Sequence, residues 1–191
     1  MLAAGVAVFI TEGYERASIE TVARDAEVAR GTFYLYFNDK LALFQAIVSP
    51  WTNGLLSLVE QASATLSTAE RPAEARAHYE QMALGIAQLG LMHQDAIMMA
   101  FRELRSPSDA GVWLRAEEEI LLQRVTEITI LARDRGLIVA PHPAITVRII
   151  VGAVERLTFD VFMGSKLGDP LLVASEVVRL FSASLFDGLE Q

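Results

Sequence analysis

The residues best suited to binding chemistry lie close together between positions 18 and 40. Arg30 can hold a guanine through two hydrogen bonds, and Thr32 can contact a phosphate or a thymine methyl group. Gly31 has no side chain, which allows a close approach to another surface. Tyr34 and Tyr36 add hydroxyl groups. This combination has little value for packing, and it indicates a surface that meets phosphates and base edges.

Two short helices are expected to hold these residues. Positions 19, 22, 23 and 26 are apolar, a spacing that gives the first helix one apolar face. Ser18 is suited to cap that helix, and Thr21 in its first turn is placed for a phosphate. A second helix is expected from about Arg30 to Tyr36, anchored by apolar side chains that face the first helix.

The stretch resembles the DNA-binding head of the TetR/AcrR-type transcriptional regulators, over roughly the first quarter of the chain. The residues that carry the resemblance are Phe9, Gly13-Tyr14, Ser18-Ile19, Val22-Ala23, the run from Gly31 to Phe37, Lys40 and Leu43-Phe44. Two positions depart from the family pattern. Glu27 stands where the family usually has glycine, and Ala29 stands where it often has a serine cap.

The resemblance implies an all-α fold of about nine helices: a three-helix helix-turn-helix head and a larger helical body for ligand binding and dimerisation. We expect the head at residues 1–45 and the body at 46–191. Lys40 is implied to hold a phosphate. The residues expected at DNA are Ser18, Thr21, Ala29, Arg30, Gly31, Thr32, Tyr34, Tyr36 and Lys40. The alternative for the two tyrosines is that they pack the head against the body.

Composition and charge narrow the function further. The 191 residues carry a net charge of −8, which is unusual for a DNA-binding protein, although net charge governs solubility more than a local site. Cysteine is absent, which excludes disulfides and thiolate metal sites. The three histidines have no metal-ligand spacing, and neither a phosphate loop nor a nucleophile elbow is present. We therefore expect no enzyme, no cofactor and no metal.

The chain lacks a secretory signal, so a cytoplasmic location without a membrane partner is expected. Residues 41–59 carry no charge and are long enough to span a bilayer, but Pro50 and several polar residues favour a buried helix. That helix is expected over 40–66, with a kink near 46–50 because proline removes a helix hydrogen bond. Further helices are expected at about 72–91, 94–105, 109–136, 144–163 and 170–189.

The body is rich in methionine and aromatic side chains, which suit an adaptable apolar pocket. Ordinary core packing is the alternative for each of them. The residues expected to line an effector pocket are Trp51, Met82, Leu89, Met98, Phe101, Trp113, Glu155 and Phe159. The last two helices have surplus apolar surface, and the family builds a dimer from them. The residues expected at this interface are Ile150, Val154, Leu157, Val161, Val177, Phe181 and Leu185.

The sequence thus predicts a homodimeric regulator, a repressor released from a palindromic double-stranded DNA operator by a small apolar effector. A dimeric regulator that responds to a protein and has no small-molecule effector is a second hypothesis. An all-α enzyme is a third, and it predicts turnover that survives the loss of Arg30.

Overall fold

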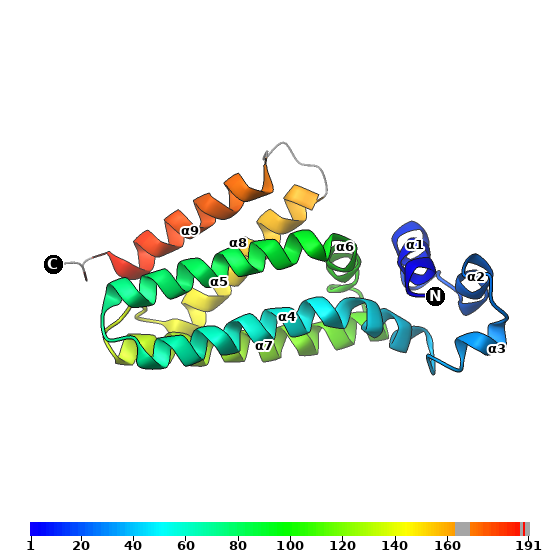
Figure 1. The fold of residues 1–191 in the computed structure, drawn as a ribbon, viewed down its shortest axis with the longest axis horizontal. Helices are drawn as coiled ribbons and strands as arrows, with labels where there is room; N and C mark the ends of the chain where they lie inside the picture. Colours follow the sequence, from blue (N-terminus) through cyan, green and yellow to red (C-terminus); the bar gives the residue numbers. More distant parts are fainter. Residues whose placement is uncertain (163–168, 188, 190–191) are drawn as a thin grey trace. The chain divides into compact units, whose positions relative to one another are not determined.

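The computed structural model describes residues 1–162, 169–187 and 189, and this part of the chain is entirely helical outside its turns and loops (Figure 1). The helices are α1 (Leu2–Glu12), α2 (Ile19–Asp25), α3 (Arg30–Phe33), α4 (Lys40–Thr68), α5 (Pro72–Met92), α6 (Gln94–Glu103), α7 (Asp109–Asp134), α8 (Pro143–Phe162) and α9 (Pro170–Phe186). The predicted all-α fold class is confirmed. Met163 and Gly168, expected near the end of one helix and the start of the next, lie outside the described residues.

The chain divides into two compact units, and the first contains residues 1–53 and 93–118. In this unit α1 packs against α2 and α6, and α2 packs against α3. Phe9, Phe33 and Phe44 are at most 2% exposed in its core. Phe9, Tyr14 and Phe44 pack against one another with ring centroids 5.2 to 5.6 Å apart, one pair stacked and two pairs edge to face. These aromatic contacts join α1 and the loop after it to the start of α4.

The second unit contains residues 54–92 and the described residues from 119 onward. Here α9 packs against both α5 and α8. Leu66, Leu137 and Phe186 are buried in its core. Two glycines let α4 and α5 approach closely: a Cβ on Gly54 would lie 2.8 Å from Leu89, and one on Gly85 would lie 2.8 Å from Leu58.

Helix boundaries follow the predictions closely, with one clear difference. The second helix of the DNA-binding segment was expected to reach Tyr36, but α3 ends at Phe33. The chain tightens there because the Leu35 and Tyr36 amides donate to the Thr32 and Phe33 carbonyls, three residues back, at 3.2 and 3.0 Å. The compact units also differ from the predicted division at residue 45/46, since α6 and the start of α7 belong with the head.

The helix α4 continues through Pro50. Within the described residues it is the one helix that is long and apolar enough to cross a bilayer by length and composition. The core helix of a soluble protein passes the same test. Leu43, Phe44 and Val48 of this helix are at most 1% exposed in the core of the first unit, but only 22% of its most apolar window is buried, less than a buried helix predicts.

Candidate nucleic-acid interface

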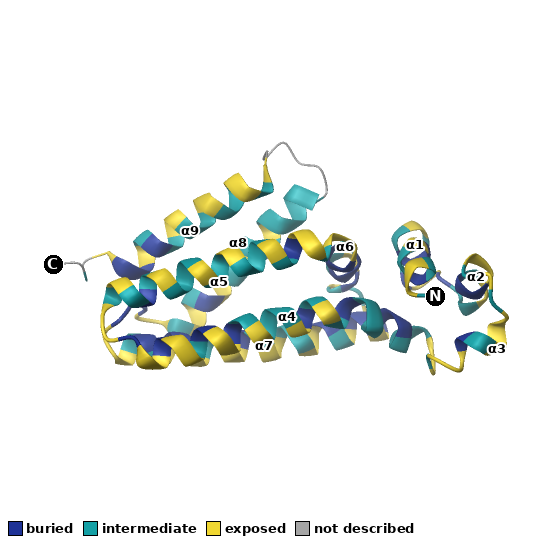
Figure 2. Ribbon diagram, viewed as in Figure 1, coloured by how far each residue is buried: buried dark blue, intermediate teal, exposed yellow. Residues whose placement is uncertain are grey.

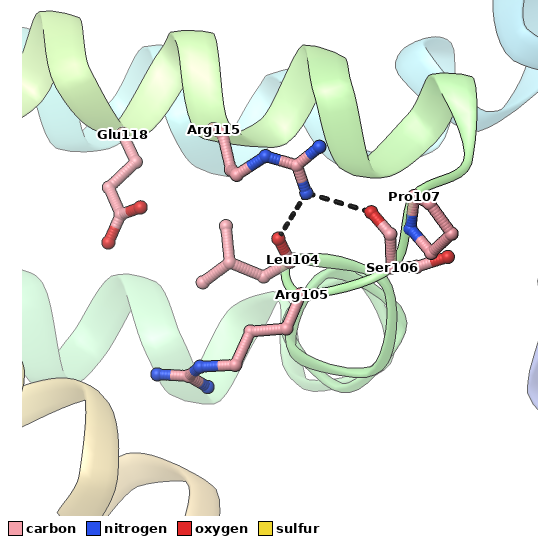
Figure 3. Close-up of a pocket in the computed structure, with 6 residues that line it drawn as sticks. All are labelled: Leu104, Arg105, Ser106, Pro107, Arg115 and Glu118. Carbon is pink, nitrogen blue, oxygen red and sulfur yellow. Dashed lines mark hydrogen bonds between the residues drawn. The ribbon is translucent and has the colours of Figure 1, made fainter.

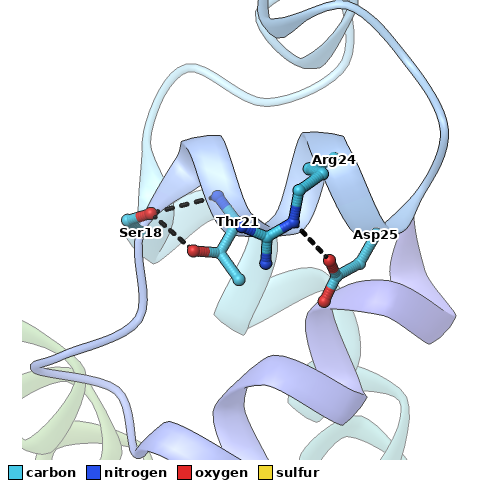
Figure 4. A network of polar contacts seen from close by, with 4 residues as sticks. All are labelled: Ser18, Thr21, Arg24 and Asp25. Carbon is cyan, nitrogen blue, oxygen red and sulfur yellow. Dashed lines mark hydrogen bonds and ion pairs between the residues drawn. The ribbon is translucent and has the colours of Figure 1, made fainter.

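The start of α2 is fixed by Ser18, as its sequence position predicts. The Ser18 hydroxyl oxygen accepts a hydrogen bond from the Thr21 amide at 3.0 Å and lies 2.9 Å from the Thr21 hydroxyl (Figure 4). This cap satisfies one of the free amides of the first turn. At the other end of the helix, Arg24 pairs with its neighbour Asp25 at 3.1 Å. Ser18 and Thr21 are both half-buried, so only part of each side chain is accessible to a ligand.

The turn between α2 and α3 has a left-handed backbone at Glu27, where the family usually has glycine. Its φ is +55°, and Glu27 is the one non-glycine residue with positive φ in the described part of the chain. The Glu27 amide donates to the Arg24 carbonyl at 3.0 Å, and the Val28 amide donates to the Ala23 carbonyl at 3.0 Å. This pair of bonds is the Schellman arrangement, in which glycine normally occupies the left-handed position.

Gly136 occupies the same position in a second Schellman turn, after α7. Its φ is +70°, its amide donates to the Arg133 carbonyl at 2.8 Å, and the Leu137 amide donates to the Ala132 carbonyl at 2.9 Å. The chain therefore holds one motif in two versions, with glutamate in the head and glycine after α7.

The helix α3 begins at Ala29 without a side-chain cap, so the missing serine is not replaced by another group. Arg30 forms an exposed ion pair with Glu20, and its Nη2 donates to the Tyr34 hydroxyl at 3.4 Å. The Tyr34 hydroxyl and the Glu20 carboxylate raise the pKa of Arg30, in that order of effect. Gly31 is exposed, and a Cβ there would meet nothing within 4 Å. The outer face of α3 is open.

The three residues that follow α3 are exposed, and they lie between two phenylalanines of the core (Figure 2). Phe33 is fully buried and Phe37 packs against the same core, with ring centroids 5.5 Å apart. Tyr34 is 45% exposed and Tyr36 is 70% exposed. Arg30 and Gly31 are exposed as well, and Thr32 is half-buried. We call residues 30–36 the recognition segment.

Lys40 has a different role from the implied phosphate contact. Its ammonium group donates to the backbone carbonyls of Tyr14, Glu15 and Ala17 at 2.7, 3.1 and 3.2 Å. It also lies 4.5 Å from the centre of the Tyr14 ring. A lysine has three N–H donors, and all three have partners here. Lys40 thus holds the loop between α1 and α2, and we leave it out of the proposed DNA contacts.

A buried carboxylate that the sequence did not single out as an anchor holds the same loop from the other side. Glu103, only 8% exposed, accepts from the Tyr14 amide at 3.3 Å and from the Ser108 hydroxyl at 3.0 Å. The Ser108 hydroxyl in turn accepts from the Gly111 amide at 3.1 Å. Burial, with a further contribution from Asp109, raises the pKa of the Tyr14 phenol. The head is therefore tied to α6 and to the start of α7.

Comparison with known proteins agrees with this geometry. Residues 1–47 match the model of the family described as "Bacterial regulatory proteins, tetR family". The N-terminal quarter of the chain is thus similar to the DNA-binding head of that family. The chain is also 45% identical over 47 residues to the uncharacterized HTH-type transcriptional regulator YvdT of Bacillus subtilis (strain 168). That match covers 25% of this chain and spans about a quarter, 24%, of YvdT.

Solved structures of bacterial regulators share the fold over nearly the whole chain. The fatty acid degradation regulator FadR from Bacillus halodurans has a TM-score of 0.72 at 17% identity, over 99% of this chain and 97% of its own. FadR from Bacillus subtilis, in complex with stearoyl-CoA, has a TM-score of 0.72 at 18% identity, over 96% of both chains. PfmR from Thermus thermophilus has a TM-score of 0.70 at 18% identity, over 100% of this chain and 98% of its own.

The residues expected to line a TetR-type effector pocket are all half-buried, and they fall in both units. Trp51, Met98, Phe101 and Trp113 belong to the first unit, and Met82, Leu89, Glu155 and Phe159 belong to the second. Trp51 and Phe101 meet edge to face with centroids 6.3 Å apart. Leu89 sits over Gly54, and Met82 packs against the core of the second unit. The pocket itself stays a prediction.

A pocket of about 490 Å³ lies at the corner between α6 and α7, away from any predicted lining residue (Figure 3). It is lined by Leu104, Arg105, Ser106, Pro107, Arg115 and Glu118. Nη1 of Arg115 donates to the carbonyls of Leu104 and Ser106 at 2.9 and 2.8 Å. These carbonyls follow the end of α6, so Arg115 satisfies acceptors that a helix end leaves free.

The expected dimer residues divide into core and surface. Leu185 is 4% exposed in the core of the second unit, and Ile150 packs against that core. Leu185 therefore supports its own chain and is not available to a partner. Val154, Leu157, Val161, Val177 and Phe181 are half-buried. The more exposed apolar residues of α8 and α9, which were not predicted at the interface, are Ile145, Ile149, Leu171, Leu172 and Leu180.

Proposed function

We propose that this protein is a homodimeric, effector-responsive TetR-type repressor that binds a palindromic DNA operator. The observation that carries the proposal is the recognition segment, an open surface of arginine, glycine and two exposed tyrosines on a TetR-family head. A helix-turn-helix places such a segment in the major groove. Family and fold are those of regulators, and we expect cytoplasmic location and no enzymatic activity.

Arg30 is the residue we propose for direct base reading. It is 60% exposed and paired with other exposed groups, Glu20 and Tyr34. An exposed ion pair contributes about 0–1 kcal/mol, whereas a bidentate contact with guanine discriminates by about 1–3 kcal/mol. Arg30 therefore gains free energy when its guanidinium leaves the Glu20 carboxylate and binds a guanine. The Thr21, Thr32, Tyr34 and Tyr36 hydroxyls are proposed to contact phosphates or base edges, with Gly31 allowing the close approach.

For the effector we propose a long apolar molecule with one polar end. The half-buried aromatic and methionine side chains expected to line the pocket support an apolar ligand. FadR from Bacillus subtilis was solved with stearoyl-CoA, which makes a fatty acyl thioester the first compound to test here. Such an effector releases DNA when it binds one state of the body better than the other, and a hundredfold release needs only about 2.7 kcal/mol of coupling.

For the dimer we propose contacts through α8 and α9. Single exposed apolar residues are normal on a monomer, but Ile145, Ile149, Leu171, Leu172 and Leu180 are each more than half exposed on two consecutive helices. Together with the half-buried valines and Phe181 they give the apolar area that a symmetric interface needs. A symmetric dimer presents two recognition segments to half-sites about 34–36 Å apart.

The decisive experiment is operator selection from random DNA duplexes with the full chain. We expect a palindromic consensus, and we expect Arg30→Ala to lose tenfold or more of its affinity for it. Arg124→Ala is the matched control, because Arg124 is 57% exposed and paired with Glu127 but lies on α7, outside the recognition segment and the proposed interface. Failure to enrich any sequence, or equal losses in both variants, would refute the DNA-reading role.

Two further measurements separate the remaining hypotheses. Sedimentation should give a dimer, and Leu180→Glu together with Phe181→Glu should shift it to a monomer. Stearoyl-CoA and shorter acyl thioesters should raise the unfolding temperature and release bound operator. A dimer that binds its operator but ignores every small molecule tested would favour the protein-responsive regulator.

A further inference from the structure

Leu35 lies in the recognition segment but was not among the residues expected at DNA. Of the exposed large apolar side chains in the described part of the chain, it has the largest exposed fraction, 81%. Its neighbours Tyr34 and Tyr36 each carry a hydroxyl that suits water or a phosphate, whereas leucine has only methyl and methylene groups. An aliphatic side chain held this far into solvent is the least expected feature of this polar surface.

The backbone fixes the direction in which Leu35 points. Phe33, two residues before it, is fully buried, and Phe37, two residues after it, packs against the same core. The Leu35 and Tyr36 amides are held by the Thr32 and Phe33 carbonyls at 3.2 and 3.0 Å. Leu35 is therefore presented outward from an ordered turn, between the exposed residues Tyr34 and Tyr36. The order of this turn lowers the entropic cost of a contact.

The chemistry of the major groove leaves one class of partner for such a side chain. The base edges there are hydrogen-bond donors and acceptors, with a single apolar group, the C5 methyl of thymine. Arg30 at the start of the segment suits guanine, which offers two acceptors and no methyl group. The two side chains thus differ in the base that each can recognise.

We propose that Leu35 is a specificity-determining residue that reads a thymine in each operator half-site by apolar contact with its C5 methyl group. The proposal rests on the DNA-binding function proposed above and adds to it a defined base preference. Removing one buried methyl group costs about fourfold in affinity. Discrimination at this position therefore depends on the methyl group itself, and not on any hydrogen bond of the base.

Replacement of thymine by deoxyuridine tests this directly, because it removes the methyl group and keeps every hydrogen-bonding atom. Each thymine of the selected operator is replaced in turn, together with its symmetry mate, and the affinities of the wild type and Leu35→Ala are compared. We expect one thymine pair at which deoxyuridine weakens wild-type binding by about fourfold per site. Leu35→Ala should bind the thymine and deoxyuridine operators equally well there.

Leu84→Ala is the matched control, because Leu84 is also an exposed leucine, at 56%, but lies on α5 in the second unit. Its deoxyuridine profile should equal that of the wild type. Unfolding temperatures of both variants should match the wild type, since surface truncations change stability by about 0.5 kcal/mol or less.

Three outcomes would overturn the proposal. Deoxyuridine could be harmless at every position, or it could weaken Leu35→Ala as much as the wild type. Leu35→Ala could also lose affinity equally for both operators, which would indicate contact with deoxyribose instead of a base. If no DNA sequence is enriched at all, the proposed function itself fails, and that result is distinct from an enriched operator that is insensitive to thymine methyl groups.

Discussion

Replacement of Glu27 by glycine should stabilise the protein, although it removes a side chain from an ordered turn. Glu27 has φ +55° at the left-handed position of the Schellman turn between α2 and α3. For an L-residue with a Cβ this conformation costs about 1–2 kcal/mol. Gly136, at φ +70° in the corresponding turn after α7, avoids that cost.

The net effect is smaller than the strain because glycine also gains freedom in the unfolded chain. That entropic term opposes the gain by about 0.5–1 kcal/mol. We therefore expect Glu27→Gly to raise the free energy of unfolding by about 1 kcal/mol. For a chain of this length that corresponds to a rise of about 2–4 °C in the unfolding temperature. Gly136→Ala should have the opposite sign and a similar size.

Thermal unfolding of four proteins checks the reasoning: wild type, Glu27→Gly, Glu27→Ala and Gly136→Ala. Glu27→Ala removes the same carboxylate but keeps the Cβ, so its unfolding temperature should stay close to that of the wild type. If Glu27→Ala is stabilised as much as Glu27→Gly, charge repulsion in the acidic head is the cause, and backbone strain is refuted. A lower unfolding temperature for Glu27→Gly would refute it as well.

Three other predictions follow from single positions. Gly31→Ala should raise the free energy of unfolding by up to about 1 kcal/mol, because alanine favours a helix and its Cβ would meet no atom within 4 Å. The same Cβ should keep α3 away from the major groove and weaken operator binding by about tenfold, as measured by titration of labelled DNA. Stability and affinity that change in the same direction would contradict this. Gly111→Ala should lower the free energy of unfolding in denaturant by about 3 kcal/mol, because its Cβ would lie 2.3 Å from the Ser106 carbonyl oxygen and 2.6 Å from that of Glu103. A loss below about 0.5 kcal/mol would show that the two backbone segments separate easily. Burial raises the pKa of Tyr79 to about 12, so its hydroxyl stays protonated in the folded state while the unfolded chain ionises near pH 10. Stability should therefore fall between pH 10 and 12, and Tyr79→Phe should fall less steeply than the wild type over that range.

The sequence predicted the elements whose signals are local. Ser18 caps α2 as expected, and the spacing of apolar residues gave its limits at Ile19 and Asp25. The sequence marked Glu27 as a departure from the family pattern, and the structure shows its positive φ. The outward direction of Leu35 follows only from the burial of Phe33 and the packing of Phe37, which the structure shows.

Roles that depend on distant partners could not be predicted. Lys40 binds carbonyls 23 to 26 residues away, and Glu103 accepts from the amide of Tyr14, 89 residues away. Only the packed head shows that the lysine ammonium faces the loop before α2. Likewise, the burial of Leu185 follows from the way α9 packs against α5 and α8, and the apolar pattern of α9 alone does not distinguish its core side from an interface.

The charged side chains of the head affect how well the protein distinguishes its operator from other DNA. Residues 1–48 contain four cationic side chains, and each has a partner within the chain: Arg16 with the Glu12 carbonyl, Arg24 with Asp25, Arg30 with Glu20, and Lys40 with three carbonyls. Affinity for any DNA grows with the number of phosphates that cations neutralise, so non-specific binding should be weak and its salt dependence shallow. Arg30 gains binding free energy by leaving Glu20 only where a guanine offers it two acceptors. A head with few free cations therefore binds all DNA more weakly than a basic head would. At the operator the contact between Arg30 and guanine offsets part of this loss, and at other sequences nothing does.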